Sequence, residues 1–210
     1  MPYVTIRQGD CVESLAVERG FCWETVWDAP ENSQLRGDRT DPHALLEGDE
    51  LFIPELTVRH EECQTEKLHT FARKGVPGLF KLQLLNEGEP VSNTGYVIKV
   101  DGLSKKGTTD AEGRLEQRIP PTARTGSITF EAAGAETTLP LMFGHIDPAD
   151  TVSGVRQRLE NLGFPGEGAG EAIDDELREA VRAFQESRGL EQSGELDDET
   201  VARIKGDHGC

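Results

Sequence analysis

The spacing of apolar residues changes twice along the chain, and this predicts three structural units. Residues 1–55 begin with the alternating stretch YVTIR, typical of a strand, and continue with helical spacing in DCVESLAVERG and WETVWDA. Residues 56–145 alternate with a period of two, and residues 146–210 return to helical spacing. We therefore expect a multidomain α+β protein with units at 1–55, 56–145 and 146–210.

The first unit is predicted to fold as strand, helix, helix and strand. Asp10 is the expected N-cap of the first helix and Gly20 its C-cap, and a turn at Gly48 leads into a last strand through LFIP. Trp23 and Trp27 lie four residues apart on one face of the second helix. That spacing favours packing in the core over stacking on a sugar.

Five alternating stretches in the second unit predict strands separated by turns. They are Leu79–Gly88, Thr94–Gly102, Gly113–Pro120, Gly126–Ala132 and Thr137–Gly144. Short strands at such intervals indicate an antiparallel β-sandwich of the immunoglobulin-like kind. The segment GTTDAEGRLEQRIP resembles the turn of transthyretin-like and carboxypeptidase-regulatory-like sandwiches, in which Asp110 and Gly113 would fix a tight turn. We expect this unit to act as a spacer.

The third unit is predicted to contain three short helices. The first runs through TVSGVRQRLENLGF and ends at Gly163, with Asp150 as its expected N-cap. Asp174 or Asp175 caps the second helix, which stops at Gly189, and a third helix starts at Asp197. The apolar positions on the inward faces are Val152, Val155, Leu159, Leu162, Leu177, Val181, Phe184, Val201 and Ile204.

The charge of the chain restricts its partners. The sequence has 39 acidic and 22 basic residues and a net charge of −17, distributed as −8, 0 and −9 over the three units. A duplex nucleic acid or an anionic membrane would be repelled by this charge, so neither is an expected partner. No apolar run of about 18 residues and no export signal is readable, which predicts synthesis in the cytoplasm.

The cysteines and carboxylates do not form a recognisable cofactor or metal site. Cys11, Cys22, Cys63 and Cys210 lack metal-site spacing, and a helix of roughly 12 Å separates the first two, which exceeds the roughly 7 Å that a disulfide allows. We therefore expect free thiols.

Two groups of acidic residues can be interpreted either as metal ligands or as ordinary structural residues. The pair Asp110 and Glu112 could be a calcium pair or only a turn, and the group His145, Asp147 and Asp150 could be metal ligands or a linker with an N-cap. The turn and the linker are the favoured interpretations. No hydrolase constellation is present, so we expect no catalysis, cofactor or metal.

Several residues of the first unit carry a family resemblance. The order strand, helix, helix, strand, with QGD after the first strand and EGD before LFIP, resembles the lysin motif (LysM). The resemblance implies binding of N-acetylglucosamine polymers such as peptidoglycan. By position, the groove would be formed by Gly9, Asp10 and Cys11 on one side and by Leu46 and Gly48 on the other. Cys11 replaces the threonine usual in that family, and the connection PENSQLRGDRTDPHALL is longer than usual.

The third unit carries a second resemblance. VRQRLENLGF and AVRAFQESRGLEQSGELDDET are similar to the peptidoglycan-binding domain attached to many wall hydrolases. The matching positions are Phe184, Gln185, Gly189, Leu190, Gly194, Asp197 and Thr200. The loop between the first two helices, EGAGEAIDDEL, departs from the family pattern.

The whole arrangement resembles a family of LysM and peptidoglycan-binding proteins that occur beside spike proteins of type VI secretion and related contractile injection systems. Two functions follow from this resemblance. The first is a non-catalytic protein that binds peptidoglycan or another N-acetylglucosamine glycan. The second is an adaptor that binds a spike or toxin protein, with the wall-binding folds reused as protein-binding surfaces. Delivery to the periplasm or the exterior by such a system would explain how a protein with wall-binding folds reaches the wall without a readable export signal.

Overall fold

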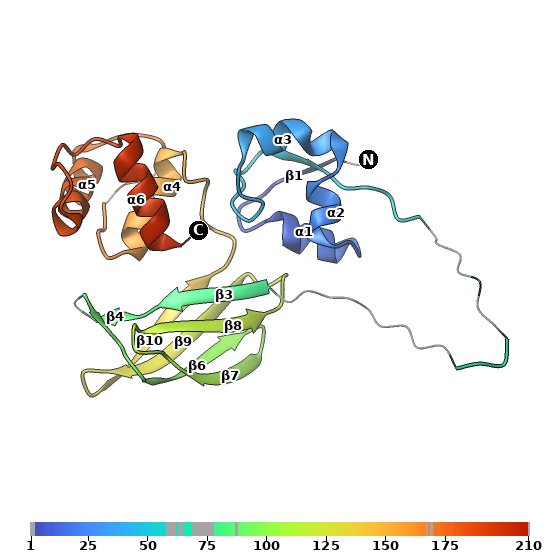
Figure 1. Cartoon of the computed structure of the whole chain (residues 1–210), viewed down its shortest axis with the longest axis horizontal. Coiled ribbons are helices and arrows are strands. Elements are labelled where there is room, and N and C mark those ends of the chain that lie inside the picture. Colours follow the sequence, from blue (N-terminus) through green and yellow to red (C-terminus); the bar gives the residue numbers. More distant parts are fainter. Residues whose placement is uncertain are drawn as a thin grey trace.

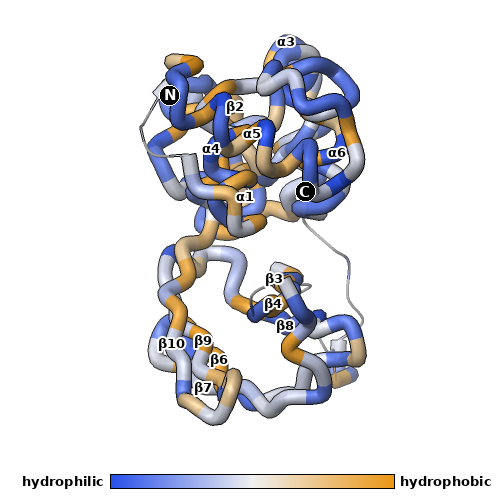
Figure 2. Tube along the Cα trace, turned by 90° about the vertical axis from the view of Figure 1, so that its left-hand side faces the viewer, coloured by the Kyte–Doolittle hydropathy of each residue, from blue (hydrophilic) through white to orange (hydrophobic). Residues whose placement is uncertain are grey.

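The computed structural model describes residues 3–57, 62, 65–68, 78–86, 88–166, 168 and 170–209. This part of the chain is a mixed α+β structure with six α-helices and several antiparallel sheets. Figures 1 and 2 show the first and third units on the same side of the β unit. The buried apolar residues form separate clusters in the three predicted units. The exact boundaries at 55/56 and 145/146 stay predictions.

The first unit has the expected order of elements, with two additional helical elements after the second helix. Strand β1 (Tyr3–Thr5) pairs antiparallel with β2 (Glu50–Phe52), and helices α1 (Val12–Glu18) and α2 (Trp23–Trp27) lie between them in the sequence. Its core includes Ile6, Val12, Val26, Trp27 and Leu51, and Trp23 packs against this cluster. The prediction that both tryptophans serve the core is confirmed. The LysM identity of this unit stays a prediction.

The predicted cap of α1 was wrong by one residue. The N-cap is Cys11, whose Sγ accepts a hydrogen bond from the Ser14 backbone nitrogen at 3.4 Å, while the Ser14 hydroxyl accepts from the Cys11 nitrogen at 3.1 Å. A serine three residues into the helix thus completes a reciprocal capping box. The Asp10 carboxylate accepts instead from the backbone nitrogen of Arg7 at 3.0 Å. Gly20 follows the helix with a φ of +83°, as expected of a terminating glycine.

The first part of the long connection after α2 is helical. It contains the 3-10 turn η1 (Pro30–Asn32) and helix α3 (Ser33–Asp38), which the sequence pattern did not predict. Asn32 is 1% exposed, and its amide nitrogen donates to the carbonyls of Val26 and Phe52 at 2.7 and 2.9 Å. Its amide oxygen accepts from the Phe52 nitrogen at 2.8 Å. One buried side chain therefore joins α2 to the last strand.

The second unit consists of antiparallel strands around one core. Sheet order is β10-β9-β6-β7, and β3 pairs with β8 and β4 with β5. The bounds are β3 Gly78–Gln83, β4 Leu85–Asn86, β5 Glu89–Pro90, β6 Gly95–Val100, β7 Leu103–Thr108, β8 Arg114–Ile119, β9 Thr125–Ala132 and β10 Ala135–Met142. Tyr96, Ile98 and Ile128 of the larger sheet share the core with Leu115 of β8. The immunoglobulin-like or transthyretin-like identity stays a prediction.

The turn predicted at Asp110 and Gly113 is confirmed. One carboxylate oxygen of Asp110 accepts from the backbone nitrogens of Glu112 and Arg114 at 3.0 and 2.7 Å. Gly113 has a φ of +73°, and a Cβ at this position would lie 2.5 Å from the carbonyl oxygen of Leu84. The turn therefore needs glycine for both conformation and space. These bonds favour the turn over a calcium pair.

The third unit has the three helices that the sequence predicted. They are α4 (Val152–Asn161), α5 (Asp175–Arg188) and α6 (Asp198–His208). Asp174 and Asp197 cap α5 and α6 as expected, but α4 is capped by Thr151, whose hydroxyl accepts from Gly154 at 3.0 Å. The expectation for Asp150 was wrong because threonine holds the position from which the side chain reaches that nitrogen. The buried apolar side chains are Val155, Leu159, Leu177, Ala180, Val181, Phe184 and Ile204.

Two predictions about the whole chain can be compared with the described residues. Cys11 and Cys22 are free thiols, as expected, whereas Cys63 and Cys210 lie outside the described residues. Within the described ranges, every helix is too short or too polar to cross a membrane.

Candidate functional site

The two loops predicted to bind glycan lie side by side at the end of β1. The Ile6 nitrogen donates to the carbonyl of Asp49 at 2.8 Å, and the Gly48 nitrogen donates to the carbonyl of Ile6 at 2.9 Å. The Asp49 carboxylate accepts from Leu46 at 2.9 Å and pairs with Arg39 through two bonds of 2.9 and 3.1 Å. The backbone bonds of Ile6 thus hold the loop 46–49 beside the start of the loop 7–11, and the ion pair ties the loop 46–49 to the residue that follows α3.

The β unit covers one of these loops. Asp10 pairs with Arg124 at 2.5 Å, and the Asp10 side chain is only 12% exposed. Gly9 is buried, and a Cβ on it would lie 3.2 Å from Arg124 Nη1 and 3.3 Å from His145 Nε2. Gly48 on the other loop is exposed, with no atom within 4 Å of such a Cβ. A glycan chain could not lie along Gly9 and Asp10 unless the β unit moved.

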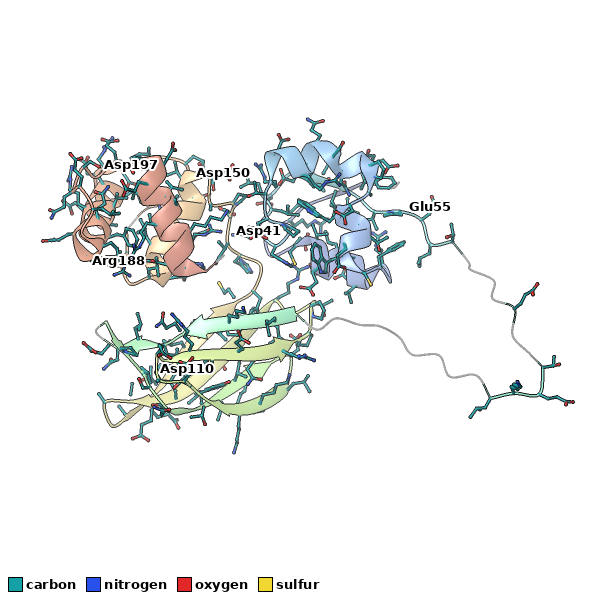
Figure 3. All side chains as sticks on the ribbon, viewed as in Figure 1. Asp41, Glu55, Asp110, Asp150, Arg188 and Asp197 are labelled. Atoms are coloured by element: carbon teal, nitrogen blue, oxygen red, sulfur yellow. The ribbon has the colours of Figure 1, made fainter. Side chains whose placement is uncertain are left out.

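The charge of Asp150, on the chain that enters the third unit, acts on Arg39 of the first unit. The hydrogen bond to Asp49 is the main cause that raises the pKa of Arg39, and the charge of Asp150 contributes to the same shift. Figure 3 labels Asp150 on the connection between the β unit and α4. The predicted groove therefore sits at a junction of units.

Three of the residues that carry the resemblance of the third unit, Gln185, Gly194 and Thr200, belong to a buried hydrogen-bond hub. Gln185 is 0% exposed, and its amide nitrogen lies 3.1 Å from the Ser193 hydroxyl, 3.3 Å from the Glu195 carbonyl and 3.0 Å from the Thr200 hydroxyl. Its amide oxygen accepts from the Gly194 nitrogen at 2.9 Å. Gln185 therefore joins α5 to the segment before α6 and to α6 itself. These positions hold the fold together.

The loop that departs from the family pattern is fastened onto α4. The Glu171 carboxylate accepts from the backbone nitrogens of Val152 and Ser153 at 2.9 and 3.2 Å, and it occupies the positive end of that helix. A hydrogen bond from the Ser153 side chain, followed by these backbone bonds, lowers the pKa of Glu171. Arg156 donates to the Ala172 carbonyl at 2.8 Å and pairs with Asp174 at 2.9 Å. These bonds thus attach the described part of the loop to α4.

A buried arginine is the feature of this unit that sequence reasoning missed. Arg158 is 1% exposed, and its Nη1 donates to the carbonyls of Asp147 and Gly154 at 2.7 and 2.9 Å. Gly154 allows the segment with Asp147 and Pro148 to lie close to α4, because a Cβ at this position would lie 2.0 Å from the carbonyl oxygen of Pro148. A glycine inside an amphipathic helix was the sequence signal that could have indicated such a contact.

The alternative metal site receives no support from the contacts of its residues. Asp147 exchanges two hydrogen bonds with Gln157, at 2.7 and 3.2 Å, which serve the entry into α4. No group of three or more His, Cys, Asp or Glu side chains among the described residues is placed to hold a metal ion.

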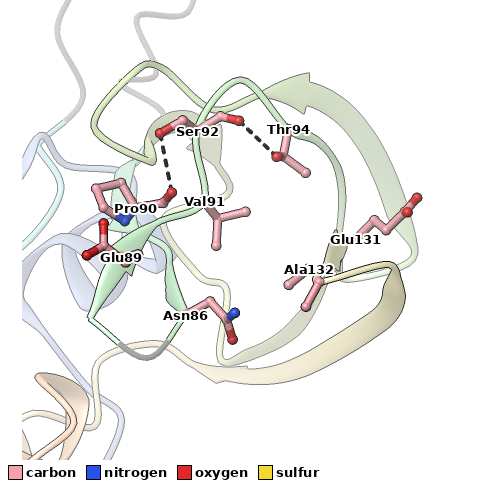
Figure 4. Close-up of a pocket in the computed structure, with 9 residues that line it drawn as sticks. Asn86, Glu89, Pro90, Val91, Ser92, Thr94, Glu131 and Ala132 are labelled. Carbon is pink, nitrogen blue, oxygen red and sulfur yellow. Dashed lines mark hydrogen bonds between the residues drawn. The ribbon is translucent and has the colours of Figure 1, made fainter.

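An open hollow of about 250 Å³ lies in the β unit (Figure 4). Its lining is Asn86, Glu89, Pro90, Val91, Ser92, Thr94, Glu131, Ala132 and Ala133. The Ser92 hydroxyl lies 2.6 Å from the Ala111 carbonyl and 3.3 Å from that of Pro90, and the Thr94 hydroxyl donates to the Ser92 carbonyl at 3.0 Å. The hollow contains none of the predicted site residues.

Comparison with known proteins gives one match. No curated protein and no solved structure gives a significant match to the chain. Residues 148–204 match the family model described as "Putative peptidoglycan binding domain". This range holds α4, α5 and most of α6, together with the Gln185 hub. The chain therefore contains a helical peptidoglycan-binding domain at residues 148–204.

Proposed function

We propose that this protein is a non-catalytic peptidoglycan-binding protein in which the third unit makes the principal contact with the glycan. The match of residues 148–204 to the peptidoglycan-binding family carries the proposal. The closed Gln185 hub supports it, because the positions shared with that family make mutually satisfied contacts. The exposed Gly48 loop of the first unit is a second, lesser contact in this proposal.

Charge determines how such binding can work. The third unit has a net charge of −9, and peptidoglycan has carboxylates of its own. Binding therefore relies on hydrogen bonds and on contacts with sugar faces, and salt reduces the repulsion between the two acidic partners. We expect the protein to bind at moderate salt at least as strongly as at low salt.

Co-sedimentation of the full chain with insoluble peptidoglycan tests the proposal. Phe184→Ala empties a fully buried position of the third unit, which costs about 3–5 kcal/mol and unfolds that unit. Phe130→Ala makes the same change in the core of the β unit and is the matched control. We expect the parent and the Phe130 variant to pellet and the Phe184 variant to stay in solution. If the parent stays in solution at both low and moderate salt, the proposal is refuted.

A second candidate function is supported by the covered loop. Because Gly9 and Asp10 lie against Arg124 and His145, the LysM-like groove is less open than a glycan site requires. This favours an adaptor that binds a spike or toxin protein of a contractile injection system and leaves the cytoplasm with it. Affinity purification of the tagged full chain from native lysate is the test. Recovery of a spike protein would support the adaptor function, and its absence would count against it.

A further inference from the structure

The outer face of the sheet β10-β9-β6-β7 carries small hydroxyl side chains and two lysines. Successive strand residues point to opposite faces of a sheet, and the inward positions Ile98 and Ile128 are 1% and 0% exposed. The outward positions between the core residues are Lys99 on β6, Ser104 and Lys106 on β7, Ser127 and Thr129 on β9, and Thr138 on β10. Lys99, Ser104, Lys106 and Thr138 are exposed. Figures 1 and 2 show β7 on the side of the β unit that faces away from the first and third units.

The register of the strands brings the two lysines together. Lys99 is paired with Ser104 of β7 on one side and with Ser127 of β9 on the other. Lys106 follows Ser104 by two residues and is therefore the diagonal neighbour of Lys99 on the same face. Diagonal neighbours lie about 7–8 Å apart, which long side chains can span. Lys99 and Lys106, called the lysine pair below, can thus reach the same carboxylate.

The polar groups around the lysine pair are available to a ligand. No carboxylate in the described part of the chain forms an ion pair with either lysine. The hydroxyls of Ser104 and Ser127, which flank Lys99, make no hydrogen bond to another described residue. The hydroxyls of Thr129 and Thr138, in contrast, bond to each other at 2.8 Å. The unpaired donors of this face therefore gather around Lys99.

Other charged residues near these strands leave this corner of the sheet positive. Glu131 and Glu136 are register partners on β9 and β10, at the opposite corner of the same face. Asp101 lies in the turn between β6 and β7. Lys105 points to the inner face, where its ammonium group donates to the carbonyl of Arg118 on β8. Two unpaired lysines against one turn aspartate give an excess of positive charge, in a chain with a net charge of −17.

We propose that the lysine pair binds carboxylates on the peptide stems of peptidoglycan, with the hydroxyls of Ser104 and Ser127 as further donors. Only the identity of the polymer rests on the proposed function. The first and third units have net charges of −8 and −9 and therefore repel an anionic polymer. A carboxylate that reaches the lysine pair meets two unpaired ammonium groups, and this charge complementarity favours the acid over its neutral amide. The β unit is then a part of the wall contact.

Amide chemical shifts of the isotopically labelled full chain test the proposal, with a soluble disaccharide–peptide fragment of peptidoglycan as the probe. A second titration uses the same fragment with its carboxylates converted to amides, which removes the charge and keeps the sugars and the peptide. We expect shifts at residues 97–99, 104–106 and 127–129 with the free acid and none there with the amide. Fitted to these shifts at low salt, the dissociation constant of Lys99→Gln/Lys106→Gln should be about threefold to tenfold higher than that of the parent. Moderate salt should narrow this difference, because it screens exposed charges.

The matched control is Lys81→Gln/Arg114→Gln, which removes two exposed cations from strands β3 and β8 of the other sheet. Both double variants have the same net charge, so a difference between them reports a local contact and not the charge of the whole chain. Equal weakening in the two variants, shifts on the outer face that persist with the amide, or no shift there with the free acid would overturn the proposal. Shifts on this face without any in residues 148–204 would support it and refute the proposed role of the third unit, so the two claims can fail separately.

Discussion

Replacing Gln185 with methionine removes the polar hub of the third unit while the side chain keeps nearly its length and volume. The amide nitrogen has two hydrogens for its three neighbours at 3.0, 3.1 and 3.3 Å, so at most two donor bonds form at once. The bond accepted from Gly194 at 2.9 Å makes a third. Three net hydrogen bonds are worth about 3 kcal/mol, and the buried Gly194 nitrogen left without a partner costs about 1–3 kcal/mol more. The added apolar burial of methionine offsets about 1 kcal/mol.

The expected loss is therefore about 3–5 kcal/mol. Tryptophan fluorescence would not report it, because both tryptophans, Trp23 and Trp27, lie in the first unit. Amide hydrogen exchange resolved along the sequence is the suitable assay. A loss of 3 kcal/mol accelerates exchange of the α5 amides more than about 100-fold, since each 1.4 kcal/mol is a factor of ten. The amides of β6 serve as a reference in the same sample.

The control for this prediction is Gln192→Met, which makes the same chemical change at an exposed position of the segment between α5 and α6. We expect it to leave exchange in α5 within about twofold of the parent. An acceleration of less than about tenfold in Gln185→Met would refute the reasoning. It would mean that the hub contributes less than about 1.4 kcal/mol and that its geometry is not a source of stability.

Three further predictions concern pH, the first unit and the junction. Burial lowers the pKa of His208 to about 4, so the unfolded state binds more protons between pH 6.5 and 4. The third unit should lose about 1–2 kcal/mol, after allowance for solvent screening, as the pH falls through this window, and hydrogen exchange in α6 should show no such loss in His208→Gln. Asn32→Ala should lower the free energy of unfolding of the first unit by about 2–4 kcal/mol, because it leaves backbone groups of Val26 and Phe52 unpaired. Urea unfolding followed by tryptophan fluorescence measures this loss, and an unchanged midpoint would contradict it. Arg124→Met should accelerate exchange at residues 9–11 about threefold to tenfold by removing the ion pair with Asp10, and equal rates would show that the β unit does not cover that loop.

The sequence was most informative where a local rule determines the structure. The helix limits at Asp174, Asp197 and Gly189 follow from capping chemistry, which depends on only a few neighbouring residues. The turn at Asp110 and Gly113 follows for the same reason. In the third unit these local signals and the apolar period agree, and the predicted helices were confirmed.

Features that depend on distant residues could not be predicted in this way. Asp10 was expected to cap α1, but its carboxylate pairs with Arg124, 114 positions away, and no local pattern encodes that choice. The helix α3 escaped prediction because its polar sequence has weak periodicity and is anchored through Asn32 to a distant strand. Strand β7, LSKKGT, was also not predicted, because its mostly exposed side chains give no apolar alternation in the sequence.

The candidate site was predictable in part. The LysM resemblance predicted that the loops of Gly9 and Gly48 form the two sides of one groove, and the structure places these loops side by side. It gave no indication that the β unit covers Gly9, because contacts between units leave no period in the sequence. Cys11 was considered only as a groove residue, and the structure shows it as the N-cap of α1.

The most direct test of the central claim is a titration of the isotopically labelled full chain with soluble muropeptides, followed by amide chemical shifts. The account predicts concentration-dependent shifts that cluster within residues 148–204, with smaller shifts near the exposed Gly48 loop and none at the covered Gly9. The same titration with Phe184→Ala should abolish the shifts of the third unit. Saturating muropeptide with no shift in residues 148–204 of the parent would contradict the claim that this unit binds peptidoglycan.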